Sequence, residues 1–116
     1  MGIIRELLSK LNRGPAIQNL ENFDMILQMK DGGVLLPIIC SRHLDHSDEN
    51  IFLVNTKIKN YLLMLKLEEF QSDFPSPTYI QIELDCVKRP DQIILDELDN
   101  ISKSLVNNGI RITWRS

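Results

Sequence analysis

The chain has 116 residues, of which 43% are hydrophobic and 25% charged, so its composition fits one globular domain and excludes an extended disordered protein. Its formal net charge of −3 excludes the sequence-independent phosphate binding that basic proteins show. No segment approaches the roughly 18 consecutive apolar residues of a membrane span, and the N-terminal segment has no continuous apolar stretch typical of a secretory signal. We therefore expect a cytoplasmic protein that binds neither nucleic acids nor membranes.

The first part of the chain predicts one helix and a β-hairpin. Residues 1–14 place aliphatic side chains at helical spacing, and a Gly-Pro pair ends this N-terminal helix. Apolar and polar residues alternate over 23–30, which predicts a half-buried strand whose odd-numbered residues face inward. An Asp-Gly-Gly turn at 31–33 leads into an apolar return strand over 33–41. Pro37 cannot donate a hydrogen bond to a neighbouring strand, so we expect this strand at a sheet edge or with a bulge.

Two helices and two strands alternate in the second part. Apolar residues at helical spacing predict a long helix over about 48–70. Strict alternation predicts a strand over 78–86. A second helix is expected over 90–109, where proline suits its start and glycine its end. Residues 110–116 alternate again and predict a final strand, with Trp114 facing the core.

The predicted order α-β-β-α-β-α-β defines a single α+β domain over residues 1–116. A hairpin followed by two helical crossovers gives a four-stranded mixed β-sheet with the two later helices packed on one face. The N-terminal helix (1–14) precedes the α+β core (22–115). The outward sheet face should be polar, and either open to a partner or covered by the N-terminal helix. Its residues should be neighbours if the last two strands pair: Tyr79, Gln81, Glu83, Asp85, Arg111, Thr113 and Arg115.

Both histidines lie in the stretch "SRHLDHSDEN", residues 41–50, with acids interleaved. His43, Asp45 and His46 could supply three ligands to a divalent metal, or one histidine could act as a general base. The structural alternative is a strand-to-helix joint, in which Ser47 is the N-cap of the next helix and Asp45 braces the loop.

No other stretch carries a catalytic signature. The chain shows no nucleophile elbow and no glycine-rich phosphate loop, and nothing around Cys40 or Cys86 suggests a reactive site. We interpret both cysteines as small buried residues in a reducing compartment, which could pair only if their strands are adjacent. We therefore predict a protein that is not an enzyme, with no catalytic residues, no metal and no cofactor.

Three stretches resemble a family of small bacterial domains of unknown function: "KDGGVLLPIICSRHLDHSDENIFLVNTKIKNYL", "EEFQSDFP" and "IELDCVKRPDQIILDELDNISKSLVNNGIRITW". The family has an H-L-D-W-type signature after the second strand, where this chain has His46 in place of the aromatic residue. Similar α+β proteins act as immunity proteins for secreted bacterial toxins, including those of contact-dependent growth inhibition. The resemblance covers roughly residues 22 to 115.

The resemblance implies a cytoplasmic immunity protein that neutralises one cognate toxin by stoichiometric binding, as a monomer or weak homodimer. The toxin would be the C-terminal domain of a large secreted protein, and a nuclease-type toxin is commonly basic. Residues 41–100 carry six basic and twelve acidic side chains, net −6, which fits such a partner. The acids expected to bind the toxin are Asp45, Asp48, Glu49, Glu68, Glu69 and Asp73, with Asp96, Glu97 and Asp99 behind them.

Two alternatives remain open. One is a small regulatory or interaction domain that has no toxin. The other is a metal-dependent enzyme that uses His43, Asp45 and His46.

Overall fold

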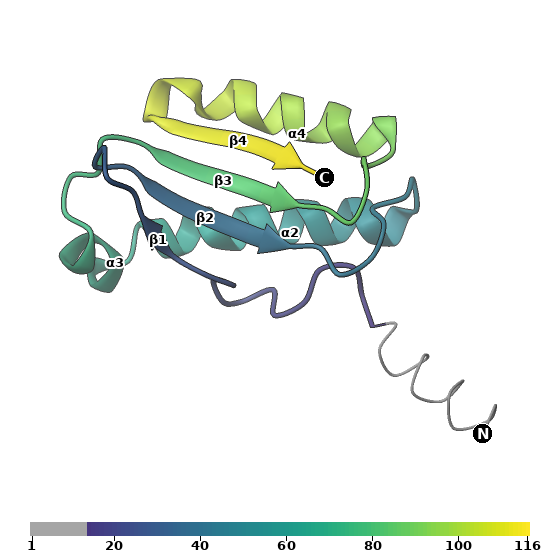
Figure 1. Cartoon of the computed structure of the whole chain (residues 1–116), viewed down its shortest axis with the longest axis horizontal. Coiled ribbons are helices and arrows are strands. Elements are labelled where there is room, and N and C mark those ends of the chain that lie inside the picture. The colour runs from purple at the N-terminus through teal and green to yellow at the C-terminus, as the bar shows by residue number, and fades with distance from the viewer. Residues whose placement is uncertain (1–13) are drawn as a thin grey trace.

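A computed structural model describes residues 14–116, so the N-terminal helix predicted over residues 1–14 lies outside the described residues but for its last position. The described part consists of four strands, three α-helices and one 3₁₀ turn. A hairpin comes first, and helical segments then connect the later strands (Figure 1). They are β1 (Leu27–Gln28), β2 (Val34–Ile39), α2 (Asp48–Leu65), α3 (Glu68–Asp73), β3 (Ile80–Asp85), α4 (Gln92–Leu105), η1 (Val106–Asn108) and β4 (Ile110–Arg115). Within these residues, no helix combines the length and the apolar character that crossing a membrane requires.

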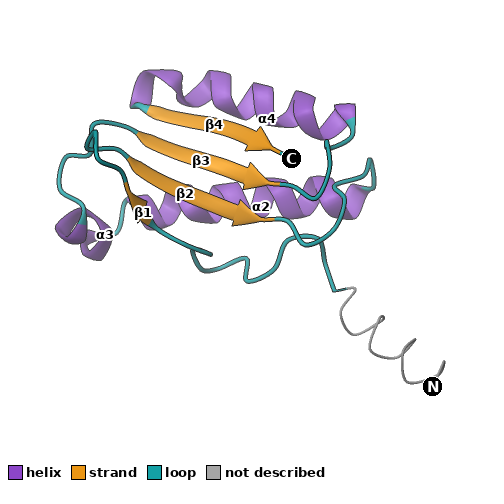
Figure 2. Cartoon of the chain, in the orientation of Figure 1, coloured by secondary structure: helices purple, strands orange, loops and turns teal. Residues whose placement is uncertain are grey.

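The strands form one mixed sheet in the order β1-β2-β3-β4. β1 runs antiparallel to β2, while β2, β3 and β4 are parallel to one another. The even-numbered residues of β2 and β3 are buried against α2 and α4, which lie on the same side of the sheet (Figure 2). This confirms the predicted α+β fold with a four-stranded mixed sheet and two helices on one face.

The predicted turn between the first two strands is also confirmed. Gly32 has a φ of 90°, a left-handed value that glycine adopts without strain, and its N–H donates to the carbonyl of Met29 at 3.1 Å. The ring of Tyr79 packs against Gly33, where any larger side chain would collide with it. The turn therefore also positions the start of β3.

A buried lysine anchors the segment that precedes β1. The Lys57 side chain on α2 is fully buried, and its Nζ lies 2.8 Å from the carboxylate of Asp24. The same Nζ lies within 2.7–2.9 Å of the carbonyl oxygens of Gln18, Asn19 and Asn22. Because a buried ammonium is costly unless every donor is satisfied, these contacts fix the path of residues 18–24.

Next to this anchor, side chains make the hydrogen bonds to the backbone of β2 that a neighbouring strand would otherwise make. The Tyr61 hydroxyl accepts a hydrogen bond from the N–H of Asp24 at 2.9 Å and donates one to the carbonyl of Pro37 at 3.0 Å. The N–H of Ile39 donates to the Asp24 carboxylate at 2.8 Å. The N–H groups of Val34 and Cys40 point to β3, so position 37 faces the opposite side, where no strand needs a donor. β2 is an inner strand in continuous register with β3, contrary to the prediction of an edge strand or a bulge, but Pro37 lies beyond the short pairing with β1, where no ladder hydrogen bond is lost.

The first strand is much shorter than predicted, because this side-chain network ends the pairing of β1 with β2. Only residues 27–28 form strand, instead of 23–30. The expected inward facing of the odd-numbered residues is also wrong after Phe23: Met25, Leu27 and Met29 are 49%, 40% and 39% exposed.

The helix predicted over 48–70 is in fact two helices. The N–H groups of Lys66 and Leu67 turn back to the carbonyls of Leu63 and Met64, which tightens and ends α2. The new direction buries Phe70, whose ring centroid lies 5.8 Å from that of Phe23 and 5.1 Å from that of Phe74. Aromatic packing thus overrides the helical pattern of the sequence.

Trp114 is not a core residue, contrary to prediction. It lies on the helix side of the sheet but is 37% exposed, because β4 is an edge strand with a neighbour on only one side.

Replacing Lys57 with Met should destabilise the protein by about 3–5 kcal/mol, because the Asp24 carboxylate and three carbonyls lose their partner inside the fold. Lys59→Met is the matched control, since Lys59 is exposed on the same helix and should change the free energy of unfolding by no more than about 0.5 kcal/mol. Urea unfolding followed by circular dichroism measures both. Equal effects of the two substitutions would contradict the anchoring role.

Candidate functional site

One carboxylate joins the stretch with both histidines to the start of α4. Asp91 is the N-cap residue of α4, and its carboxylate lies 3.3 Å from His43 Nε2 and 3.1 Å from His46 Nδ1. The N–H of His46 donates to the same carboxylate at 3.0 Å, and the N–H of Asp91 donates to the carbonyl of Leu44 at 3.0 Å. His43 Nε2 also lies 3.2 Å from the carbonyl oxygen of Arg89. These contacts tie the loop between β2 and α2 to the first turn of α4.

The same loop caps α2 from within. The Asp45 carboxylate accepts hydrogen bonds from the N–H of Ser47 at 2.9 Å and from the side-chain amide of Asn50 at 2.8 Å. Ser47 Oγ accepts one from the N–H of Asn50 at 3.2 Å. Hydrogen bonds from Ser47 lower the pKa of Asp45, and those from His46 lower the pKa of Asp91. The predicted N-cap and the bracing role of Asp45 are confirmed.

The contacts of the loop are those of a structural joint. Within residues 14–116, no group of three or more His, Cys, Asp or Glu side chains is placed to hold a metal ion. Asp45 uses its carboxylate for Ser47 and Asn50, so it does not complete a centre with the two histidines. The role of Asp91 could not be predicted from the sequence, because this residue lies 45 positions from His46.

The nine acids predicted to bind a toxin fall into three groups on the structure. Three lie at the start of α2 or in the loop before it (Asp45, Asp48, Glu49), three lie on α3 (Glu68, Glu69, Asp73) and three lie on α4 (Asp96, Glu97, Asp99). The 18 residues of α2 separate the first group from the second by about 27 Å, since a helix rises about 1.5 Å per residue. The six acids of first choice therefore do not share one surface.

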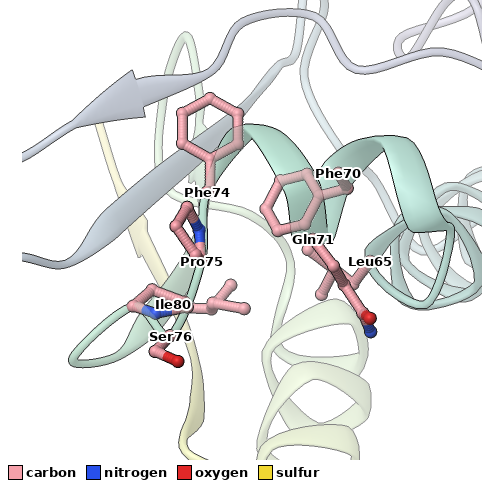
Figure 3. Close-up of a pocket in the computed structure, with 8 residues that line it drawn as sticks. Leu65, Phe70, Gln71, Phe74, Pro75, Ser76 and Ile80 are labelled. Atoms are coloured by element: carbon pink, nitrogen blue, oxygen red, sulfur yellow. The ribbon is translucent and has the colours of Figure 1, made fainter.

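Two largely apolar cavities flank the short helix α3. The larger one, about 420 Å³, has Leu65, Phe70 and Gln71 on one side and Phe74, Pro75, Ser76 and Ile80 on the other (Figure 3). The smaller one, about 210 Å³, is lined by Met64, Leu67, Phe70 and Phe74 among others. Because Phe70 and Phe74 line both cavities, α3 divides one apolar region into two.

Unpaired acids stand beside this apolar region. Glu69 and Asp73 line the smaller cavity, and Glu68 precedes them on α3. All three are exposed, and among residues 14–116 their carboxylates have no hydrogen-bond or ion-pair partner. Leu67, which also lines the smaller cavity, is 55% exposed. We call these three acids, Leu67 and the two cavities the α3 site.

The α3 site was only half predicted. Its three acids were named from the sequence, whereas its cavities were not. The available signal was the run "FQSDFPSP", in which two phenylalanines four residues apart precede two prolines that prevent a regular helix.

The outward sheet face carries polar side chains that pair with one another. Gln81 and Thr113 form a hydrogen bond of 3.0 Å across β3 and β4, as the predicted pairing of these strands requires. Arg115 Nε lies 2.7 Å from Asp85 and 3.2 Å from Glu83. The guanidinium of Arg111 stacks over the ring of Tyr79 at 3.9 Å. The charged side chains on this part of the face are therefore already engaged with one another or with an aromatic ring.

The lowered pKa of Asp91 makes stability depend on pH. Its charged form contributes stability above the ordinary carboxyl pKa of about 3.9, and this contribution is lost as the pH falls through the lowered folded value. Asp91→Asn keeps a good N-cap residue but removes the charge. We expect the wild type to resist more urea than D91N near neutral pH, and the two unfolding midpoints to converge below about pH 4. A gap that persists in acid would contradict this role.

Comparison with known proteins identifies a family whose model covers most of the chain. Neither a curated protein nor a solved structure matches the chain. Residues 15–116 match a family described as a family of unknown function (DUF6572). This match covers the α+β core, from the segment held by Lys57 to the last strand. The chain therefore belongs to the DUF6572 family.

Proposed function

We propose that this protein is an immunity protein that neutralises a secreted bacterial toxin by stoichiometric binding, and that the α3 site contacts the toxin. The observation that carries the proposal is the coincidence of apolar cavities with three unpaired, exposed carboxylates on one short helix. The sequence resemblance to immunity proteins supports the nature of the partner.

The composition of the α3 site suits a protein partner. The energetic centre of a protein interface is commonly an apolar anchor that fills a pocket, surrounded by a polar rim. The cavities beside Phe70 and Phe74 can accept apolar side chains from a partner, and Leu67 offers apolar surface at their edge. Glu68, Glu69 and Asp73 then form the rim.

The charge of the rim favours a basic partner. Three carboxylates within six residues concentrate negative charge, and Lys66, the C-cap residue of α2, is the basic residue next to them in the sequence. Complementary charge accelerates encounter and disfavours wrong partners. A nuclease-type toxin has the basic surface that this arrangement would attract.

Among the other acids, Asp48 and Glu49 are also exposed and unpaired within residues 14–116, but they line neither cavity of the α3 site. Several of the remaining acids are already engaged. The carboxylates of Asp45 and Asp91 are engaged in the loop, Asp99 pairs with Lys103 at 3.0 Å, and Glu97 lies 3.5 Å from the amide of Asn55. Because these side chains already have partners within the fold, a toxin would gain less by contacting them.

The decisive experiment begins with the neighbouring reading frames: where one encodes a large secreted protein, its C-terminal domain is co-expressed with this chain and the pair is titrated by calorimetry. We expect a one-to-one complex and protection of cells from the toxin domain. A regulatory domain without a toxin would have no such neighbour and would form no such complex. Absence of a complex would overturn the proposed function.

Two matched triple variants test the surface. Glu68→Gln, Glu69→Gln and Asp73→Asn together should weaken binding at least about tenfold, mainly through faster dissociation. Asp96→Asn, Glu97→Gln and Asp99→Asn remove the same charge from α4, and should alter mainly association and its salt dependence. Equal losses from both triples would show that only net charge matters and would contradict the α3 site.

A matched pair of single variants tests the apolar part of the α3 site. Leu67→Ser should reduce affinity, because Leu67 lines the smaller cavity. Leu63→Ser changes a leucine of similar exposure, 53% against 55%, that lines neither cavity, and should leave affinity unchanged. Surface plasmon resonance with the immobilised toxin domain measures both.

A further inference from the structure

The two cysteines of the chain lie side by side at the carboxyl ends of neighbouring strands. The parallel register pairs Ile38 with Leu84 and Ile39 with Asp85, so Cys40 stands beside Cys86. The N–H of Cys40 continues the ladder by donating to the carbonyl of Asp85 at 2.9 Å. Neighbouring strands lie about 4.8 Å apart, within the Cα separation of about 4.4–6.8 Å that a disulfide spans.

Both thiols point in the same direction. Cys40 Sγ lies 3.7 Å from the carbonyl oxygen of Ile38, and Cys86 Sγ lies 3.7 Å from that of Leu84. The two side chains therefore have the same relation to their own strands. The neighbouring Cys86 thiol, with burial, raises the pKa of Cys40, and the neighbouring Cys40 thiol lowers the pKa of Cys86. Cys86 is thus the thiol that ionises first.

A cavity gives access to this pair from one side. It measures about 310 Å³ and is lined by both cysteines, together with Asp85, Val87, Arg115 and Ser116. Cys40 is only 2% exposed, whereas Cys86 is half-buried. A small reagent that enters the cavity meets Cys86 first and finds Cys40 behind it.

We propose that Cys40 and Cys86 form a redox-active thiol pair, which hydrogen peroxide or a similar two-electron oxidant converts into an intramolecular disulfide. The inference is independent of the toxin partner. Cys86 is the attacking thiol and Cys40 the resolving thiol. A disulfide here links the ends of β2 and β3, directly beside the loop that carries His43.

The chemistry balances in two steps. The thiolate of Cys86 attacks one oxygen of the peroxide, the O–O bond breaks, and Cys86 becomes a sulfenic acid as hydroxide leaves. The sulfur of Cys40 then attacks the sulfenic sulfur. The S–S bond forms, the S–OH bond breaks, and the hydroxyl leaves as water with the proton of Cys40. Two thiols and one peroxide give one disulfide and two waters, and a small dithiol reverses the reaction.

Mass spectrometry of the full chain tests the proposal. After brief treatment with hydrogen peroxide, the monomer should lose the mass of two hydrogens, and digestion should yield one peptide that links residues 40 and 86. Dithiothreitol should restore the original mass. Oxygen addition on Cys86 without a linked peptide, a dimer joined through Cys86, or no reaction would each overturn the proposal.

Single variants separate the two roles. In Cys40→Ser the sulfenic acid of Cys86 has no resolving thiol, so dimedone should trap it. In Cys86→Ser the remaining thiol, Cys40, should resist both peroxide and dimedone. A Cys40 that reacts as fast as Cys86 would contradict the assigned roles.

A measurement on the wild type tests the proposal without depending on whether the variants fold. Iodoacetamide applied to the native protein should alkylate Cys86 at least about tenfold faster than Cys40, because alkylation requires an accessible thiolate. Peptide mapping at successive times gives both rates, and equal rates would overturn the proposal.

Discussion

The buried ammonium of Lys57 is the constraint on which the rest of the described structure depends. An ammonium removed from water needs compensation for its lost hydration, and here three backbone carbonyls and the Asp24 carboxylate supply it. Those carbonyls belong to a segment without regular secondary structure, which apolar packing alone would leave undefined. Asn19 accepts a φ of 51° within this segment, a left-handed value that asparagine tolerates better than most residues. The lysine thus converts an irregular segment into a fixed part of the fold.

The effect of this anchor extends to the α3 site through a short chain of contacts. Once Asp24 is fixed, Phe23 lies with its ring 4.7 Å from that of Tyr61, in an edge-to-face arrangement. The other neighbour of Phe23 is Phe70, and Phe70 in turn packs on Phe74. α3 has only six residues and no side-chain cap, so these aromatic contacts hold it in place. The cavities and acids of the α3 site are therefore positioned by a lysine that lies outside them.

The sequence predicted those features whose causes are local. β3 and β4 alternate strictly between apolar and polar residues, and the residues around Ser47 contain the groups that cap α2. Features with distant causes were missed. Asp24 looks like the solvent-facing residue of an alternating strand, yet it binds a lysine 33 positions away. No glycine or proline marks the break at Lys66 and Leu67, since the break results from the burial of Phe70. The same distinction applies to the α3 site. Its acids can be read from the sequence, whereas the cavities beside them arise only from the packing of distant residues.

The coincidence of unpaired acids with apolar cavities argues for binding at the α3 end, since Asp48 and Glu49 at the other end of α2 are unpaired within residues 14–116 but line neither of these cavities. At the opposite end of α2, the carboxylates of Asp45 and Asp91 are engaged by the loop and its histidines. On the outward sheet face, Arg115 pairs with Asp85 and Glu83, and the guanidinium of Arg111 stacks on the ring of Tyr79. A group that is already satisfied gains little from a partner, because a new contact must replace an existing one. Glu68, Glu69 and Asp73 have no such contact among the described residues, and the anchored aromatic cluster holds them beside apolar surface before any partner arrives. A surface that is ordered in advance loses less conformational entropy on binding, which favours the tight binding that the proposed function needs.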